Sequence, residues 1–153
     1  MKKIITILLS MILVLLSSAC LSSNKQNTKA QYYKDMLFVN QYAKDLDGVI
    51  DCEYEMAVFG SNDRLSVPGP SDYAYSGVIY LEEEEAEDIF NSYSWTQDST
   101  FNQTAIGTIS LASFNGDTWY RCDDFAKEKF PTLNVKYLRF NSKNAIIFDC
   151  MTY

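Results

Sequence analysis

The sequence contains no histidine. This absence excludes Ser-His-Asp and Cys-His nucleophilic sites, zinc sites built on histidine, and acid-base catalysis by an imidazole. The neighbouring carboxylates of Asp123 and Asp124 could act as an acid-base pair, but two acids at the start of a short helix more commonly interact with the helix dipole. We therefore expect that the protein is not an enzyme, with no catalytic residue, no metal ion and no cofactor.

Basic residues are also scarce. Lysine and arginine number 13 against 20 aspartates and glutamates, and the formal net charge is −7 at pH 7. The basic residues are scattered among acidic ones, whereas nucleic-acid binding needs clustered positive charge, so we expect no nucleic-acid partner. The run from Glu82 to Glu85 is interpreted as the solvated start of a helix rather than a calcium site, because consecutive side chains point around a helix.

One long apolar run stands near the start of the chain. It extends from Ile4 to Leu16, follows Lys2 and Lys3, and is interrupted only by Thr6 and Ser10. A run of this length is too short to cross the ~30 Å hydrocarbon core of a bilayer as a helix. A positive start, a short apolar run and small residues before a cleavage point are typical of an export signal peptide, here residues 1–19.

The end of this leader carries a more specific pattern. The segment Leu16-Ser17-Ser18-Ala19-Cys20 resembles the lipobox of bacterial membrane lipoproteins, with Ser17 where leucine is usual. The resemblance covers the leader alone and implies cleavage before Cys20, diacylglycerol on that cysteine, and attachment through acyl chains such as palmitate to a cell membrane or outer membrane surface. The alternative is ordinary secretory cleavage after Ala19. Residues 20–30 are polar and without hydrophobic period, which is typical of a flexible tether.

Residues 31–153 are expected to form a single α+β domain. Apolar side chains alternate in some segments and recur every three or four residues in others. Strands are predicted over 51–58, 77–81, 104–114, 135–140 and 145–153, and helices over 31–46, 82–93 and 119–130. The expected architecture is a small two-layer domain, mainly an antiparallel sheet with about three helices packed on one face and water on the other.

A long polar segment between two predicted strands is a candidate for recognition. Residues 60–76 are rich in Ser, Asn, Asp, Pro and Gly, and connections of this length are often binding loops. We predict a binding loop that uses Arg64, Asp72, Tyr73 and Tyr75, since aromatic and arginine side chains are favoured at interfaces. The alternative is a loop without function, with the aromatic residues in the core or at its rim.

Three cysteines remain once Cys20 is set aside, and export would place them in an oxidising compartment. Cys52 and Cys150 share the parity of inward-facing residues in their predicted strands, so a disulfide between them is our first prediction. A bridge between Cys122 and Cys150, or three reduced and buried thiols, are the alternatives.

These observations leave three functional hypotheses. The first is a lipid-anchored module that binds an envelope protein or a glycan, with the acidic, aromatic-rich domain presented at the cell envelope. The second is an acidic inhibitor or immunity-type protein that neutralises a basic partner. An enzyme is the third and is disfavoured by the absence of histidine.

Overall fold

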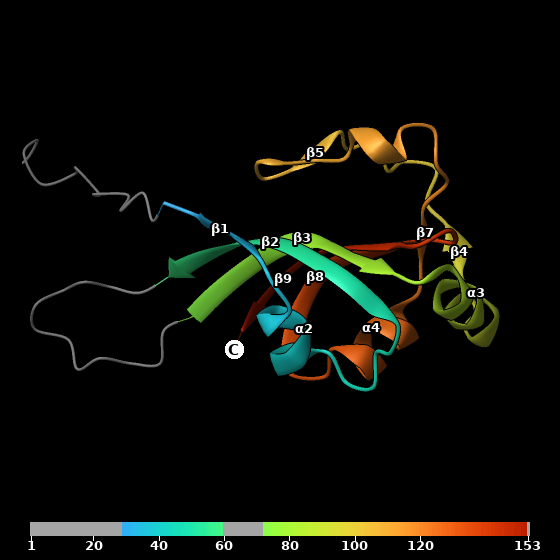
Figure 1. Ribbon diagram of the computed structural model, residues 1–153, viewed down its shortest axis with the longest axis horizontal. Coiled ribbons are helices and arrows are strands. Elements are labelled where there is room, and N and C mark those ends of the chain that lie inside the picture. Colours follow the sequence, from blue (N-terminus) through green and yellow to red (C-terminus); the bar gives the residue numbers. More distant parts are fainter. Residues whose placement is uncertain (1–28, 60–71, 153) are drawn as a thin grey trace, which may run out of the picture.

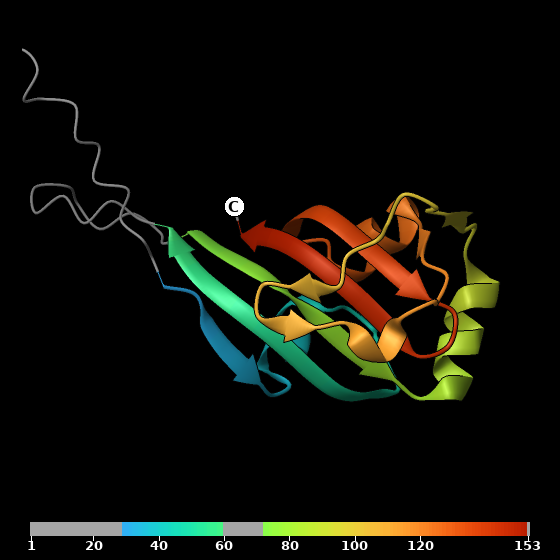
Figure 2. The same ribbon diagram turned by 90° about the horizontal axis from the view of Figure 1, so that it is seen from above.

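An antiparallel sheet of seven strands organises the fold, in the order β1-β2-β3-β9-β8-β7-β4 (Figures 1 and 2). The computed structural model describes residues 29–59 and 72–152. The strands of this sheet are β1 (Gln31–Lys34), β2 (Val49–Phe59), β3 (Asp72–Leu81), β4 (Thr96–Gln97), β7 (Tyr120–Arg121), β8 (Leu133–Asn141) and β9 (Ala145–Thr152). A separate two-stranded sheet pairs β5 (Ala105–Ile106) with β6 (Ile109–Ser110).

Three helices contribute to the hydrophobic core on one face of the sheet. They are α2 (Leu37–Tyr42), α3 (Glu83–Ser92) and α4 (Asp123–Lys129). In Figure 1, α2 and α4 lie below the sheet and α3 lies at one end of it. Each helix buries side chains against the strands, among them Phe38 of α2, Ile89 of α3 and Phe125 of α4. The predicted α+β architecture is therefore confirmed.

The opposite face of the sheet is more covered than the sequence predicts. The segment between β4 and β7, which contains β5, β6 and the short 3-10 helix η2 (Ala112–Phe114), lies over this face (Figure 1). Its apolar side chains form a second buried cluster with residues of β3 and β9: Val78, Ile106, Ile109, Leu111, Phe114, Trp119, Ala145 and Ile147. The expectation that this face meets water is wrong over the area of the cluster.

A buried carboxylate holds the β5–β6 hairpin on the sheet. Glu55 of β2 is 9% exposed, and its Oε1 atom accepts hydrogen bonds from the backbone N–H of Thr108, at 2.9 Å, and from the Thr108 hydroxyl. Gly107 lies at the hairpin tip with φ +56°, and a Cβ there would be 2.0 Å from Glu55 Oε2. Glycine is therefore required at this position by both the backbone conformation and the contact.

Two predicted elements differ from the observed ones. The helix predicted over 31–46 is replaced by β1, which pairs with β2 from Gln31↔Met56 to Lys34↔Glu53, followed by the short helix α2. The strand predicted over 104–114 is a two-residue hairpin followed by η2. In both segments the short-range sequence pattern predicted the wrong element, because strand pairing and burial in the tertiary structure outweigh local propensity.

The remaining elements follow their sequence patterns, although the helix predicted over 119–130 begins only at Asp123, because Tyr120–Arg121 form β7. Cys52 and Tyr54 of β2 are buried at 0% and 4% exposure while Glu53 between them is half-buried, as the alternation predicts. The helix predicted over 82–93 corresponds to α3, with Ala86 and Ile89 buried. Strands β8 and β9 correspond to the strands predicted over 135–140 and 145–153, and they pair as an antiparallel hairpin.

Candidate functional site

The predicted site residues do not come together as one loop surface. Cys20 and Arg64 lie outside the described residues. Asp72 is exposed at the first position of β3, and Tyr73 is half-buried in the same strand, where its backbone N–H donates to Thr152 Oγ1 at 2.8 Å. The segment 72–76 is therefore strand rather than loop, because β3 continues its pairing with β2 to this end.

Tyr75 is a core residue, and its predicted place on a binding loop is wrong. It is 6% exposed, its ring lies 5.3 Å from the ring of Phe38, and its hydroxyl is 3.0 Å from the Tyr42 hydroxyl. Burial, followed by the hydrogen bond with Tyr42, raises the pKa of the Tyr75 phenol. The ring therefore contributes to packing under α2 and not to an exposed recognition surface.

The predicted disulfide between Cys52 and Cys150 is also wrong. Strand β3 separates their strands, with Cys52 paired to Ile79 and Cys150 paired to Tyr75. Two strand spacings of about 4.8 Å already exceed the roughly 7 Å that a disulfide allows between Cα atoms.

All three described cysteines are free and buried. Burial raises the pKa of the Cys52 and Cys150 thiols to about 12. Thiols of this kind are poor nucleophiles, because the reactive species is the thiolate. Cys122 differs in position, since it lies at the start of α4 and its Sγ accepts from the backbone N–H of Phe125 at 3.5 Å.

Metal-binding groups do not gather in the described part of the chain. Within residues 29–59 and 72–152, no three side chains of His, Cys, Asp or Glu are placed to hold a metal ion. Asp123 and Asp124 are both exposed in the first turn of α4, and Lys127 and Lys129 occupy its last turn. This charge distribution stabilises the helix through its dipole.

A groove of about 480 Å³ lies between α4 and β8. Its lining alternates apolar and charged side chains: Cys122, Asp123, Ala126, Lys127, Phe130, Pro131, Leu133, Val135, Lys136, Tyr137, Leu138 and Arg139. This volume is within the range of about 300–1,000 Å³ that is usual for ligand sites. A second hollow of about 400 Å³, lined also by Ser94, Thr96, Arg121 and Asp124, shares Cys122, Asp123 and Lys127 with the groove.

The local sequence explains why the groove has this shape. Helix α4 follows the Cys122 cap, buries Phe125 completely, and ends before Pro131, which cannot continue a helix. The chain then turns directly into β8, so the helix and the strand form the two walls of the groove. On its outer edge β8 pairs with β7 only through Tyr120↔Phe140, which leaves residues 133–139 without a neighbouring strand among the described residues.

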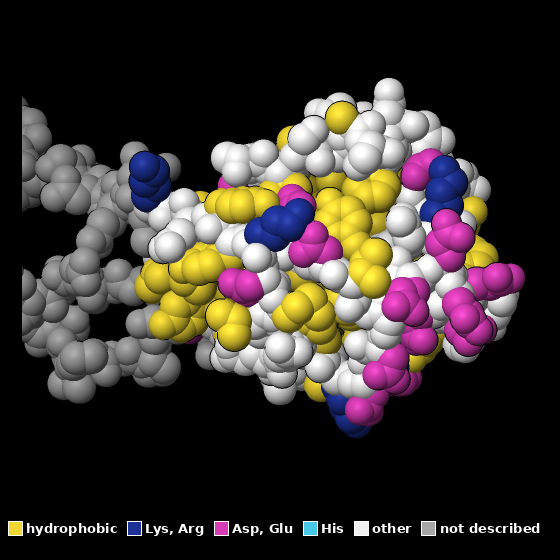
Figure 3. Space-filling view, viewed as in Figure 1, with side chains coloured by type: hydrophobic (Ala, Val, Ile, Leu, Met, Phe, Trp, Pro, Cys, Tyr) yellow, Lys and Arg dark blue, Asp and Glu magenta, His cyan; other side chains and the backbone are white. Residues whose placement is uncertain are grey.

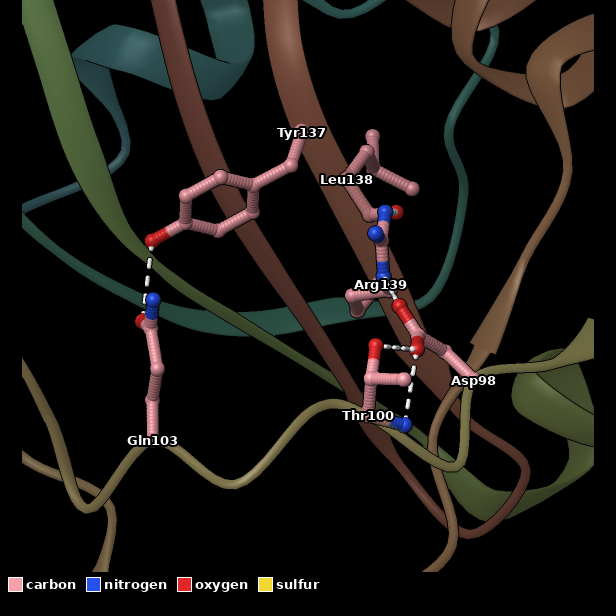
Figure 4. A network of polar contacts seen from close by, with 6 residues as sticks. All are labelled: Asp98, Thr100, Gln103, Tyr137, Leu138 and Arg139. Atoms are coloured by element: carbon pink, nitrogen blue, oxygen red, sulfur yellow. Dashed lines mark hydrogen bonds and ion pairs between the residues drawn. The ribbon is translucent and has the colours of Figure 1, made fainter.

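An ion pair and several hydrogen bonds hold a neighbouring segment against β8. Arg139 Nε donates to Asp98 Oδ2 at 2.7 Å, and Asp98 Oδ1 accepts from the Thr100 hydroxyl at 2.6 Å and from the Thr100 backbone N–H at 3.1 Å (Figure 4). The Tyr137 hydroxyl donates to Gln103 Oε1 at 3.2 Å in the same region. The Thr100 hydroxyl and then Arg139 lower the pKa of Asp98 to about 2, against an opposing effect of burial. These bonds hold the segment 98–103 against β8.

The positive charges of the groove differ in how they are compensated. Lys136 pairs with Asp149 at 3.1 Å and Arg139 pairs with Asp98. Lys127 of the groove and Arg121 of the adjoining hollow are exposed and form no ion pair within the described part of the chain. The sequence predicted a helix over 119–130 but not this groove, because the spacing of residues along α4 and β8 does not show that β7 leaves most of the β8 edge open.

Comparisons with protein-family models, with curated proteins and with solved structures found no match, so the function of this groove is argued from its chemistry alone.

Proposed function

We propose that the chain is a lipid-anchored bacterial lipoprotein whose domain is a binding module at the cell envelope, and that the α4–β8 groove is its binding site. The anchor is supported by the resemblance of residues 16–20 to a lipobox. The groove is the observation that carries the binding role, since it combines a ligand-sized volume with partly apolar walls and Lys127, a cation without an ion pair among the described residues, beside the open part of β8.

The position of the groove supports presentation away from a membrane. Lys29 and Ala30 are exposed and lead into β1, which forms one edge of the sheet. The β8 strand stands four places along the sheet from β1. At about 4.8 Å per strand, the groove is therefore separated from the point where the anchor joins the domain by roughly 19 Å. Among the residues that the structure describes, no helix has the length and apolar character that a membrane span requires.

A binding role fits the groove better than catalysis does. The chain has no histidine, and the Cys122 thiol in the lining is 8% exposed and hydrogen-bonded to the backbone of its own helix. Asp123 is exposed, which leaves its carboxylate in water rather than in a shielded pocket where an acid-base role would be tuned.

Acidic side chains over α3 favour a second candidate, an inhibitor of a basic partner. Asp and Glu side chains gather over the α3 end of the molecule in Figure 3. Glu82, Glu83, Glu84, Glu87 and Asp88 are exposed there, and none of them forms an ion pair with another described residue. Such a surface suits a positively charged partner, whose association rate it would increase.

The anchor is tested with Cys20→Ala. We expect the variant to lose lipid labelling and to leave the membrane fraction, because two acyl chains provide stable attachment and the leader is too short to span. A variant that remains in the membrane with its leader removed normally contradicts the lipoprotein proposal.

The binding site is tested by filling the groove. Ala126→Leu adds three carbon atoms to a half-buried position in α4 and keeps a strong helix former. Chemical crosslinking of the full chain in intact cells is compared for wild type, Ala126→Leu and the double variant Glu83→Lys/Glu84→Lys. Loss of the crosslinked partner in Ala126→Leu alone supports the groove, whereas loss in the double variant alone favours the inhibitor function.

A further inference from the structure

We infer that the ligand of the α4–β8 groove is a short, extended peptide segment of a partner protein, with an apolar side chain placed between carboxylates. This inference rests on the proposed binding function of the same groove. It is argued from the open strand edge, the apolar floor and the uncompensated cations.

The open edge of β8 favours an extended main chain. On the outer edge of β8, residues 133–139 have no strand beside them in the described structure, while on the other edge β8 pairs with β9 except at Lys136. Backbone N–H and C=O groups along such an edge can bond to an extended peptide, which is a common mode of peptide recognition. The groove lies along this edge, so a peptide that follows β8 places side chains into it.

Two features of β8 limit how much chain is bound. The register with β9 shifts between Val135 and Tyr137, and Lys136 occupies the bulge with a side chain that is 72% exposed. Bulges and lysines on edge strands prevent long strand-to-strand pairing and aggregation. We therefore assign the groove to a short segment held by its side chains, and not to a complete added strand or a second copy of this chain.

The floor of the groove selects an apolar side chain. Ala126 and Phe130 from α4 and its C-cap face Leu133, Val135 and Leu138 of β8 across the groove. Phe130, Leu133 and Leu138 are already buried in the core, so a peptide side chain inserted here removes from water its own apolar surface and that of the half-buried Ala126 and Val135.

The rim selects the charge of the flanking residues. Lys127 and Arg121 form no ion pair with another described residue, whereas Lys136 and Arg139 are already compensated by Asp149 and Asp98. The net charge of the whole chain, −7, opposes an acidic ligand at long range. At physiological salt, charges more than about 8 Å apart are largely screened, so the preference is decided locally by Lys127 in the groove and Arg121 in the adjoining hollow, against Asp123, which lines both.

An acyl chain is a poorer occupant than a peptide. Charged and polar side chains, among them Asp123, Lys127 and Tyr137, line the groove together with the apolar ones. A lipid tail would remove these groups from water without offering them hydrogen bonds, which is unfavourable. A peptide backbone offers both donors and acceptors.

Fluorescence anisotropy with the full chain in detergent tests the inference. The probe is a labelled eight-residue peptide that alternates leucine and aspartate. Matched probes replace each aspartate by lysine, or each leucine by serine. The variants are Lys127→Glu, which reverses an exposed rim charge, Ala126→Leu, which fills the groove, and Lys29→Glu, an exposed lysine at the distant β1 end that serves as the charge control. Thermal melting of each variant checks that it folds.

We expect the leucine–aspartate peptide to bind and both matched probes to bind at least about tenfold more weakly. Lys127→Glu should weaken binding by about three- to tenfold, as expected for reversal of one exposed charge, and Lys29→Glu by less than about twofold. Ala126→Leu should abolish binding.

Several results overturn the inference: equal binding of the lysine probe, equal binding of the serine probe, or equal effects of Lys127→Glu and Lys29→Glu. Binding of a fluorescent fatty acid together with no binding of any peptide also overturns it. If no peptide binds while Ala126→Leu still removes the crosslinked envelope partner, the peptide inference is wrong and the binding function stands. If Ala126→Leu leaves the crosslinked partner in place, the groove is not the binding site and both are wrong.

Discussion

The ion pair between Asp98 and Arg139 should be a principal polar contribution to stability, and Asp98→Asn tests it. The two side chains are only 11% and 18% exposed, and the Asp98 carboxylate also accepts two bonds from Thr100. Asparagine keeps the shape and one acceptor oxygen but removes the charge that Arg139 faces. Hydrogen bonds to charged groups contribute about 1.5–3 kcal/mol, so we expect the free energy of unfolding to fall by about 2 kcal/mol at pH 7.

The pH dependence follows from the direction of the pKa shift. The pKa of Asp98 is about 2 in the folded protein, against the ordinary value of 3.8 for an aspartate. The unfolded chain therefore binds more protons between these two values, so the contribution of Asp98 is complete above pH 3.8 and is lost as the pH falls through 2. The difference in unfolding free energy between wild type and Asp98→Asn should accordingly narrow below about pH 4 and vanish below about pH 2.

The matched control is Asp149→Asn. Asp149 pairs with Lys136 at 3.1 Å, but the Lys136 side chain is 72% exposed. Exposed pairs contribute about 0–1 kcal/mol, so this variant should lose less than about 1 kcal/mol. Urea unfolding followed by tryptophan fluorescence measures both variants across the pH range. Equal losses for the two variants at pH 7, or an Asp98→Asn effect that persists unchanged at pH 2, would refute the reasoning.

Three further predictions concern the core and the thiols. Tyr75→Ser should lower the unfolding free energy by about 3 kcal/mol or more, because the ring is buried. Tyr73→Ser, at a half-buried position, should lower it less. Urea unfolding midpoints compare the two variants, and equal losses would contradict the assigned burial. Mass spectrometry of the denatured protein should count Cys52, Cys122 and Cys150 as free thiols, and a bridge between Cys52 and Cys150 would contradict the strand order. In the native protein at pH 8, iodoacetamide should label Cys122 before Cys52 and Cys150. Cys122 lines the groove, whereas burial raises the pKa of the other two thiols to about 12. Faster labelling of Cys52 or Cys150 would contradict this expectation and show that the core opens more readily than the groove.

Local sequence patterns were sufficient to predict a helix or strand where one face of the element packs on the core and the other is exposed to water. The alternation of Cys52, Glu53 and Tyr54 predicted β2, and the spacing of Ala86 and Ile89 predicted α3. In these segments burial imposes the same period on the sequence that the element has in space.

The segment at residues 31–46 shows where such patterns fail. Tyr32, Met36, Val39 and Ala43 recur at helical steps, yet Gln31–Lys34 forms β1 on the open edge of β2. Pairing with β2 satisfies backbone groups and stacks Tyr33 on Tyr54 with ring centroids 5.2 Å apart. The sequence of residues 31–46 alone does not show that the edge of β2 is free to pair with this segment.

The candidate sites also divide into features that the sequence predicts and features that depend on the tertiary structure. The sequence by itself determined the likeness to a lipobox at Cys20, the acidic charge, the absence of histidine chemistry, and most of the sheet and helices, because each depends on residue identity or on short-range periodicity. Only the tertiary structure decided that Tyr75 is core, that β3 separates Cys52 from Cys150, and that β8 has an open edge beside α4. Strand order and register bring together residues that are far apart in the chain, and a period of two or 3.6 residues carries no information about which strand will be the neighbour.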